Sequence, residues 1–339
     1  MRAPEFWWRR ERSPAASLLA PLSALAGAYA SARLKREGRD VGIPVICVGN
    51  PTVGGSGKTP TAIHLAHRLS GLGRRAVFLT RGYGGSLRGP VIVDPNRHTS
   101  AEVGDEPLLL ARTAPVIVGR DRVVAALGAE RLGAEALVMD DGFQNPALSK
   151  SLSILVVDAA VGVGNGLVLP AGPLRAPLAP QFERADALLL IGNGAPGEEI
   201  GARAASAGLP VLHARLAPEA GAAARLIGQR LYAFAGIGRP AKFFATLDAI
   251  GLRPAKTRAF ADHHVFTEAE IETLLREADI GGFTLVTTEK DAARLAASAQ
   301  GRVLLRTTEV LPVRLVPDEA SGHELERLLA KALTPARAV

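Results

Sequence analysis

The sequence predicts an α/β fold in which a mostly parallel sheet is flanked by helices. Three observations support it: short apolar runs alternate with helical stretches, a glycine-rich loop joins the first run to a helix, and polar motifs follow the ends of several runs. At 339 residues, with 47% hydrophobic residues, the chain is long enough for two domains with cores of their own.

The expected elements form two series, separated by an Ala/Gly-rich segment at residues 216–224. We predict an N-terminal amphipathic helical segment over residues 1–40, a main domain over 41–218 and a smaller α/β domain over 219–339. The last helix of the smaller domain can pack back on the main one. Expected strands are 44–49, 76–79, 91–93, 116–118, 136–139, 154–157 and 187–191, then 231–235, 283–287 and 303–305; helices are expected near 240–250, 267–277 and 322–333.

The most informative motif is the segment 52–59, Thr-Val-Gly-Gly-Ser-Gly-Lys-Thr. It follows the apolar run 44–49 and opens a helix with Pro60 in its first turn, which together form an anion site. In such a phosphate-binding loop (P-loop), backbone N–H groups wrap the phosphates, Lys58 reaches the terminal phosphates and the Thr59 hydroxyl binds Mg²⁺. The fold is therefore predicted to be of the P-loop NTPase type, binding a nucleoside triphosphate. The expected nucleotide-binding residues are Thr52, Val53, Gly54, Gly55, Ser56, Gly57, Lys58 and Thr59.

One position of this loop departs from the usual pattern, which opens with Gly where this chain has Thr52. Gly54, Gly55 and Gly57 still allow the backbone to approach a phosphate closely. The alternative interpretation is a glycine-rich turn with an incidental lysine. It does not account for the strand before the loop and the helix after it.

A pair of carboxylates, Asp140 and Asp141, follows the apolar run 136–139. This is the pattern of the second nucleotide motif, in which one of the two holds Mg²⁺ directly or through water. We predict Thr59 and Asp140 as metal ligands and count both carboxylates among the catalytic residues. Acidic turns are common after strands, so this interpretation depends on the P-loop upstream.

Three more polar segments follow expected strands or open expected helices: Arg81–Gly85, which contains Tyr83, then Gly104–Pro107 and Gly119–Arg122. In the last of these, Arg120 and Arg122 can clamp a phosphate. Each segment can equally be a turn, a helix cap or a solvated ion pair, and these alternatives stay open.

The N-terminus concentrates the positive charge. Residues 1–40 contain eight Arg or Lys and four Asp or Glu, which gives +4 of the total net charge of +7. Between the basic clusters lies an Ala/Leu-rich stretch, residues 14–32, preceded by Phe6, Trp7 and Trp8. The stretch is short for a membrane span and is expected to be broken by Pro21, and a signal peptide fits poorly. We expect an interfacial helix at a membrane surface, and a helix packed on the protein remains the alternative.

Composition argues against two other classes. With 4% aromatic residues, scattered basic residues and no legible nucleic-acid module, we expect no nucleic-acid partner despite the basic balance. The single cysteine, Cys47, excludes an internal disulfide and lies in an expected core strand, which fits a reducing cytosol.

The order of these motifs resembles the tetraacyldisaccharide 4′-kinase family of the lipid A pathway. The resemblance spans almost the whole chain, from the Phe-Trp-Trp start onward, and in it the Thr at the first P-loop position is the family's own variant. The matching segments are 52–60, Arg81–Gly85, Gly104–Pro107, Asp140–Gln144, Pro170–Arg175, Ala233–Gly238, Asp262–His264 and Thr288–Asp291.

The resemblance implies a kinase of Gram-negative bacteria, peripheral on the cytoplasmic face of the inner membrane. It would use ATP and Mg²⁺ to phosphorylate the 4′-hydroxyl of a tetraacylated disaccharide 1-phosphate, giving lipid IVA. Asp105 would act as base with His263, because a sugar hydroxyl must lose its proton as the phosphoryl group transfers. The oligomeric state stays open. Residues expected to bind substrate are Tyr83, Glu106, Arg120, Arg122, Gln144 and Arg175.

Two positions depart from the family pattern. Members often have Glu where this chain has Ala176 and His where it has Asn145. Roles of those side chains elsewhere therefore do not transfer.

Functions from other classes fit less well. A regulatory GTPase needs Asn-Lys-x-Asp after a strand, and the nearest segment, 288–291, lacks the Asn and the spacing. A partitioning ATPase needs a Lys where Val53 stands. A membrane-associated nucleotide-binding regulator without lipid kinase activity stays open, because motifs cannot show turnover.

Overall fold

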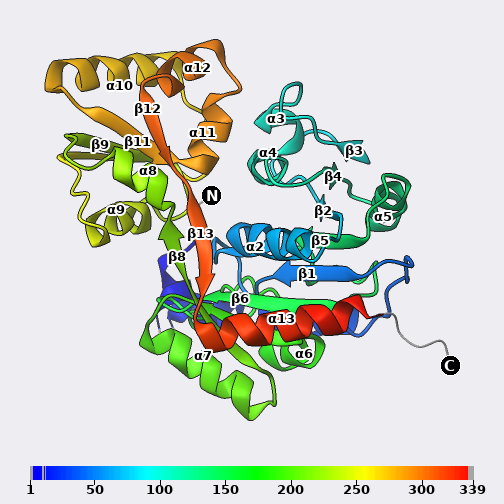
Figure 1. The fold of residues 1–339 in the computed structure, drawn as a ribbon. Helices are drawn as coiled ribbons and strands as arrows, with labels where there is room; N and C mark the ends of the chain where they lie inside the picture. Colours follow the sequence, from blue (N-terminus) through cyan, green and yellow to red (C-terminus); the bar gives the residue numbers. More distant parts are fainter. Residues whose placement is uncertain (1–2, 10, 12, 335–339) are drawn as a thin grey trace.

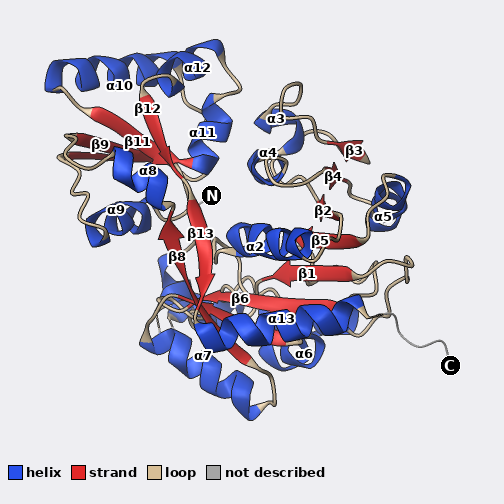
Figure 2. Cartoon of the chain, in the orientation of Figure 1, coloured by secondary structure: helices blue, strands red, loops and turns tan. Residues whose placement is uncertain are grey.

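The computed structural model describes residues 3–9, 11 and 13–334 (Figures 1 and 2). The elements are η1 (Glu5–Trp8), α1 (Pro14–Leu34), β1 (Val45–Gly49), α2 (Lys58–Gly71), β2 (Ala76–Thr80), β3 (Val91–Ile92), α3 (Ser100–Val103), α4 (Asp105–Leu110), β4 (Val116–Val118), α5 (Arg122–Arg131), β5 (Ala136–Asp140), β6 (Leu152–Asp158), α6 (Leu178–Arg184), β7 (Ala187–Ile191), α7 (Ala195–Ser206), β8 (Val211–Pro218), α8 (Ala220–Arg225), β9 (Leu231–Ala235), α9 (Pro240–Ala249), β10 (Lys256–Ala259), α10 (Glu268–Gly281), β11 (Thr284–Thr288), α11 (Glu289–Leu295), α12 (Ala299–Leu305), β12 (Thr308–Leu311), β13 (Val313–Pro317) and α13 (Glu319–Leu333).

The larger of two sheets has nine strands in the order β13-β8-β7-β6-β1-β5-β2-β4-β3. It is parallel except at its edges, where β3 runs antiparallel to β4 and β13 antiparallel to β8. Because the parallel strands share a direction, the loops that follow β1, β2, β4 and β5 meet at one edge of the sheet. The predicted mostly parallel sheet is confirmed.

Helices cover both faces of the larger sheet, so its central strands are buried on both sides. Along β1, Ile46 and Val48 face a core shared with α2, α4 and α13, whereas Val45 and Cys47 face a core shared with α1, α5, α6 and α7. This alternation follows from the two-residue repeat of a strand. Burial raises the pKa of the Cys47 thiol to about 11, which keeps it protonated and unreactive at neutral pH.

The smaller sheet is entirely parallel, in the order β10-β9-β11-β12. Helices α8 and α9 pack on one face, and α10 and α12 on the other. The chain enters this part from β8 and returns through β13, which pairs with β8; α13 then packs on the larger sheet (Figure 1). An antiparallel pair of neighbouring strands is therefore the covalent link between the two sheets.

Residues 303–305 correct one expectation, because they end helix α12 instead of forming a strand. Ser298 caps this helix by accepting a hydrogen bond from the Gly301 N–H at 2.9 Å, and Leu304 is fully buried under the smaller sheet. The fourth strand of that sheet is β12, three residues later. A three-residue apolar run fits a buried strand or a buried helix face equally well, and here packing selected the helix.

The N-terminal helix α1 is unbroken from Pro14 to Leu34, so the expected break at Pro21 was wrong. The helix-forming Ala and Leu residues around Pro21 and the docking of α1 on the main body outweigh a penalty of about 3 kcal/mol. The docked face consists mainly of small residues: Ala16, Ser23 and Gly27 are buried, and the Ser23 hydroxyl donates to the Val168 carbonyl at 2.6 Å. By length and composition, α1 is apolar enough to cross a membrane.

Candidate active site

The P-loop connects β1 to α2 in the way the sequence predicts. Gly54 and Gly57 have φ of 107° and 95°, backbone conformations that favour glycine. A Cβ on Gly57 would also collide with the side chain of Ile191. Two hydrogen bonds brace the loop: the Val53 N–H donates to the Pro173 carbonyl at 2.9 Å, and the Asn50 amide donates to the Gly54 carbonyl at 3.1 Å.

Lys58, the first residue of α2, is buried and faces polar partners. Its ammonium group donates to Asn50 Oδ1 at 3.1 Å and lies 3.9 Å from the Asp141 carboxylate. Burial lowers the pKa of Lys58, and the charge of Asp141 opposes this shift. Asn50 was not predicted; it lies on the loop between β1 and the motif and orients both the loop and the lysine.

Asp140, the last residue of β5, has an oxygen available for a cation. Its Oδ2 accepts a hydrogen bond from the Thr59 hydroxyl at 3.0 Å, while Oδ1 is buried without a hydrogen-bond partner. Burial, together with the charge of Glu106, raises the pKa of Asp140 to about 7. An orphaned carboxylate oxygen beside a threonine hydroxyl suits Mg²⁺, which binds one or two protein oxygens and completes its shell with phosphate and water. Among the described residues, no group of three or more His, Cys, Asp or Glu is arranged to hold a metal ion.

Asp141 has φ of 57° and turns its carboxylate back toward the P-loop. Arg175 clamps it with two hydrogen bonds, Nη1 to Oδ1 at 2.7 Å and Nη2 to Oδ2 at 3.1 Å, and its Nε donates to the Thr52 carbonyl at 3.0 Å. Gln144 donates to the Asn50 carbonyl at 2.9 Å. Burial raises the pKa of Asp141, but the charges of Lys58 and Arg175 outweigh it and hold the pKa below its ordinary value.

Asp105 is the first residue of helix α4, and it contacts residues of the loop after β10 and of α11, which belong with the smaller sheet. Its Oδ2 lies 3.0 Å from His263 Nδ1 and 2.8 Å from Arg294 Nε. Burial raises the pKa of Asp105, but the hydrogen bond with His263 and the charge of Arg294 together hold it below its ordinary value. The same hydrogen bond raises the pKa of His263. This carboxylate–imidazole pair can accept a proton and stabilise it.

Glu106, next to Asp105, interacts with α11 on one side and with the charged residues around the P-loop on the other. It forms an ion pair with Lys290 of α11 at 2.7 Å, and the charge of Lys290 holds its pKa below the ordinary value. Glu106 is also close enough to Asp140 and Lys58 for their charges to affect one another's pKa. Helix α4, which begins with Asp105 and Glu106, packs against α2, so the Asp105–His263 pair and the P-loop lie on neighbouring elements.

Comparison with known proteins identifies the arrangement. The family of LpxK, the tetraacyldisaccharide-1-P 4′-kinase, matches residues 15–334. The chain belongs to this family. Tetraacyldisaccharide 4′-kinase of Methylobacterium sp. (strain 4-46) is 56% identical over 323 residues, 95% of each chain, and that of Methylobacterium nodulans is 54% identical over 336 residues, 99% of this chain and 97% of the relative. A solved structure, the "apo" form of LpxK from Aquifex aeolicus in complex with ATP, has a TM-score of 0.70 at 26% identity and covers 94% of this chain and 99% of its own.

The residues expected to bind the kinase's substrate lie in different settings. Tyr83 is exposed, and its ring centroid lies 5.8 Å from that of His263, so it borders the Asp105–His263 pair. Arg120 is exposed after β4. Arg122 instead points inward and donates to the carbonyls of Thr80 (3.1 Å) and Gly119, and burial lowers its pKa to about 10. The structure therefore does not bring Arg120 and Arg122 together as a clamp.

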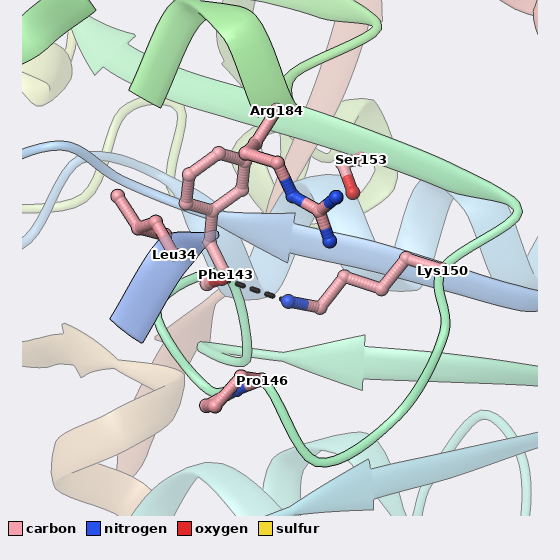
Figure 3. Close-up of a pocket in the computed structure, with 6 residues that line it drawn as sticks. All are labelled: Leu34, Phe143, Pro146, Lys150, Ser153 and Arg184. Atoms are coloured by element: carbon pink, nitrogen blue, oxygen red, sulfur yellow. Dashed lines mark hydrogen bonds between the residues drawn. The ribbon is translucent and has the colours of Figure 1, made fainter. Parts of the chain in front are cut away.

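The two residues that depart from the family pattern, Asn145 and Ala176, lie in different settings. Lys150 donates to the carbonyls of Phe143 and Asn145, both at 2.8 Å, beside a small cavity between Leu34 and Arg184 (Figure 3). Asn145 Oδ1 accepts from the Ala147 N–H at 2.8 Å, so its side chain closes the turn. Ala176 is fully buried in the core beneath α1, where it contributes packing rather than charge.

A third set of contacts crosses between the sheets at the P-loop. Asp158, at the end of β6, is buried and pairs with Arg239 and Lys242 at the start of α9. Arg239 also donates to the Gly55 carbonyl at 3.2 Å. The part of the chain around the smaller sheet thus contacts both the P-loop and Asp105. Asp158, Arg239 and Lys242 were not predicted, because the residues they contact lie far away in the sequence.

Proposed function

We propose that this protein is an ATP-dependent kinase that phosphorylates the 4′-hydroxyl of tetraacyldisaccharide 1-phosphate, giving lipid IVA. One observation carries the proposal: the Asp105–His263 pair lies at the start of α4, and α4 packs against α2, the helix that follows the P-loop and whose Thr59 hydroxyl contacts the partly unpaired Asp140 carboxylate. A nucleotide-binding regulator has no need of a proton acceptor opposite its terminal phosphate. Family membership and the ATP named with the solved relative support the same conclusion.

The side chains divide the reaction between them. The P-loop amides and Lys58 hold the β- and γ-phosphates in place. Thr59 and Asp140 would hold Mg²⁺, which neutralises phosphate charge when bound. Asp105 accepts the proton of the sugar hydroxyl as the new P–O bond forms and the bond to the bridging oxygen of ADP breaks. His263 keeps the carboxylate oriented and stabilises the proton it receives.

The residues around this centre have supporting parts in the proposal. Asp141 and Arg175, with Gln144, hold the P-loop through the contacts described above. Tyr83, Glu106 and Arg120 border the acceptor, where they can bind its sugar and phosphate groups. Arg122 acts indirectly, by fixing the backbone from which Arg120 projects.

We also propose that α1 brings the enzyme to the bilayer, at the cytoplasmic face of the inner membrane. Leu18, Leu22, Leu25 and Tyr29 recur at helical spacing, and these residues are 83%, 56%, 71% and 64% exposed. The opposite face is docked on the main body, so the apolar stripe is free to enter the acyl boundary while the protein stays on the surface. The Trp7 indole donates to the Pro170 carbonyl at 3.0 Å, which ties this end of the chain to the loop that carries Arg175. Of the basic residues expected to meet lipid, Arg2, Arg10 and Arg12 lie outside the described residues.

We also propose that the chain divides into two domains at residue 219. In this proposal the smaller sheet moves relative to the larger one about the β8–β13 pair, and residues 313–334 stay with the larger, nucleotide-binding part. Opening would admit a lipid headgroup to the space between Asp105 and the P-loop.

The experiment that tests the function is a transfer assay with γ-labelled ATP and purified tetraacyldisaccharide 1-phosphate in detergent micelles. The expected product is the disaccharide labelled at the 4′ position. The control acceptor is the same lipid already phosphorylated at that position. ATP hydrolysis at an equal rate with either lipid, and no labelled lipid, would favour a regulator over a kinase.

A further inference from the structure

Arg294, on α11 of the smaller sheet, is a buried charge at the edge of the active site. Its side chain is only 5% exposed, and its Nε donates to Asp105 Oδ2 at 2.8 Å. Nη1 donates to the Gly236 carbonyl at 2.8 Å and to Asp291 Oδ1 at 3.1 Å. Nη2 is buried without a hydrogen-bond partner.

The buried Arg294–Asp105 ion pair is not expected to add much to the stability of the fold. A buried ion pair regains little more than it loses by desolvation, and an unpaired N–H adds to the cost. Well-packed apolar residues would join the two sheets equally well. The retention of a charge there therefore calls for a role that depends on the charge and on its geometry.

The geometry at Asp105 indicates that role. Both of its side-chain hydrogen bonds, from Arg294 and from His263, go to Oδ2. Oδ1 receives none from the described residues, so it is the oxygen left to accept a proton. Two contacts from different directions fix the plane of the carboxylate, which a single contact from His263 would allow to rotate.

Arg294 is itself held by two segments that follow strands of the smaller sheet. Asp291 accepts hydrogen bonds from the Gly236 N–H at 3.0 Å and from the Thr288 hydroxyl at 2.6 Å. Thr288 and Asp291 belong to the Thr-Glu-Lys-Asp segment at the end of β11, and Gly236 follows β9. These two segments form a platform that presents the guanidinium to α4.

We propose that Arg294 is a positioning residue for the base: it fixes Asp105 through Oδ2 so that Oδ1 faces the acceptor hydroxyl, and it does so only when the smaller sheet is docked on α4. This inference rests on the proposed role of Asp105 as base. Asp105 is then oriented for proton transfer only when the smaller sheet is docked on α4. In an open enzyme, without the Arg294 contact, the carboxylate is not held in the reactive orientation.

The test compares Arg294→Met and Arg294→Lys with Arg302→Met, a matched loss of an exposed arginine on α12 of the same sheet. Full-length proteins are assayed for transfer in lipid micelles, and the Kd for ATP is measured separately. We expect Arg294→Met to lower kcat by about 10- to 100-fold while the Kd for ATP changes by less than about twofold. Arg294→Lys, which keeps the charge and one donor, should regain part of the loss, and Arg302→Met should resemble the unmodified protein.

A double-mutant cycle with Asp105→Asn separates positioning from a structural role. If Arg294 acts through Asp105, the variant that contains both Asp105→Asn and Arg294→Met should be no slower than Asp105→Asn alone within about twofold, whereas structural damage would add to the loss. Thermal unfolding identifies any variant that fails to fold, and Arg294→Lys then takes the place of Arg294→Met in the cycle.

The outcomes distinguish this inference from the proposed function. Near-normal transfer by Asp105→Asn would overturn the base assignment itself. Loss of transfer by Asp105→Asn, combined with an additive effect or no effect of Arg294→Met, would keep the base and overturn the role of Arg294. A changed Kd for ATP with unchanged kcat would likewise contradict positioning of the base.

Discussion

The nucleotide end and the acceptor end of the active site are built in different ways. The P-loop, Lys58 and Thr59 come from one contiguous segment that runs from the end of β1 into the start of α2, and the Thr59 hydroxyl donates to Asp140 on the neighbouring strand β5. At the acceptor end, Asp105 contacts His263 and Arg294, which are 158 and 189 residues away in the sequence. Both lie in the part of the chain built around the smaller sheet.

Under the proposed assignment of residues, this difference means that one part of the molecule would bind ATP, whereas proton transfer would need both parts. The predicted nucleotide-binding residues all lie within the nine-stranded sheet and its helices, although Arg239, beside α9, also donates to the Gly55 carbonyl of the P-loop. The acceptor end exists only in the docked arrangement, because its second and third members come from the loop after β10 and from α11. Substitutions that loosen the packing of the smaller sheet on α4 should therefore change kcat and the KM for lipid. Substitutions in the P-loop should change the Kd for ATP.

The largest expected effect comes from removing the base. Asp105→Asn should lower kcat by roughly 10²- to 10⁴-fold, because proton acceptance matters only in the transition state. The Kd for ATP should stay nearly unchanged, since Asp105 touches the smaller sheet and not the P-loop. Transfer at saturating ATP and calorimetric binding of ATP check the two halves of the prediction. Weaker ATP binding without a change in kcat would contradict the separation of the two ends.

The converse effect is expected at the nucleotide end. Lys58→Ala removes a charge from the terminal phosphates and Thr59→Ala removes a Mg²⁺ ligand, and each should lower turnover by about 10²-fold or more, or roughly 3 kcal/mol of barrier. Unlike Asp105→Asn, both should weaken binding of ATP with Mg²⁺. Arg68→Ala, at an exposed position further along α2, is the control. Near-normal transfer by Lys58→Ala would remove the P-loop assignment.

The same contrast explains how much could be predicted from the sequence. The parallel sheet, the P-loop and the two carboxylates at the end of β5 follow local patterns, so periodicity and spacing were sufficient to predict them. The partnership of Asp105 with His263 was expected only from the family resemblance, and no pattern indicated Arg294 or Asn50. Their roles depend on which segments pack together, which the sequence does not state locally. Strand β8 and the edge strand β13 were missed for the same reason, and the residue roles and the boundary at 219 stay predictions.

A smaller effect is expected from the apolar stripe of α1. Leu18→Asn with Leu25→Asn should raise the apparent KM for lipid by about tenfold, because burying a leucine in an apolar phase contributes about 1.5–3 kcal/mol and an interfacial helix gains part of this. The Kd for ATP should not move. The control, Ile227→Asn with Ile280→Asn, changes two exposed apolar residues away from α1. Deleting the helix is a poorer test, since Ala16 and Leu34 are buried and their loss would disturb the fold.

Liposome flotation checks the stripe independently of turnover. The doubly substituted α1 should float less with anionic liposomes than the control pair does, and high salt should weaken what remains, because basic residues such as Arg33 contribute through screened charge. Equal flotation of both variants would mean that the membrane contact lies elsewhere on the molecule.

The smallest expected effect is a pH-dependent contribution of the Asp105–His263 pair to stability. The pKa of His263 is raised in the folded protein, so its contribution is fully present below the unfolded value of about 6.5 and is lost as pH rises through the folded value. The pKa of Asp105 is lowered, so its contribution is present above about 3.9 and is lost as pH falls through the folded value. Both contributions are present together between about pH 4 and 6.5.

Thermal unfolding of His263→Gln against the unmodified protein should therefore show its largest difference near pH 5, and the difference should shrink above neutral pH. The His263 side chain is 42% exposed, so screening limits the effect to a small shift in Tm. In an Asp105→Asn background, His263→Gln should lose this pH dependence, because the carboxylate that raises the pKa is gone. A Tm difference that is constant from pH 5 to 8 would mean that His263 contributes packing alone. In that case the acceptor end would be held together by Arg294 rather than by the imidazole.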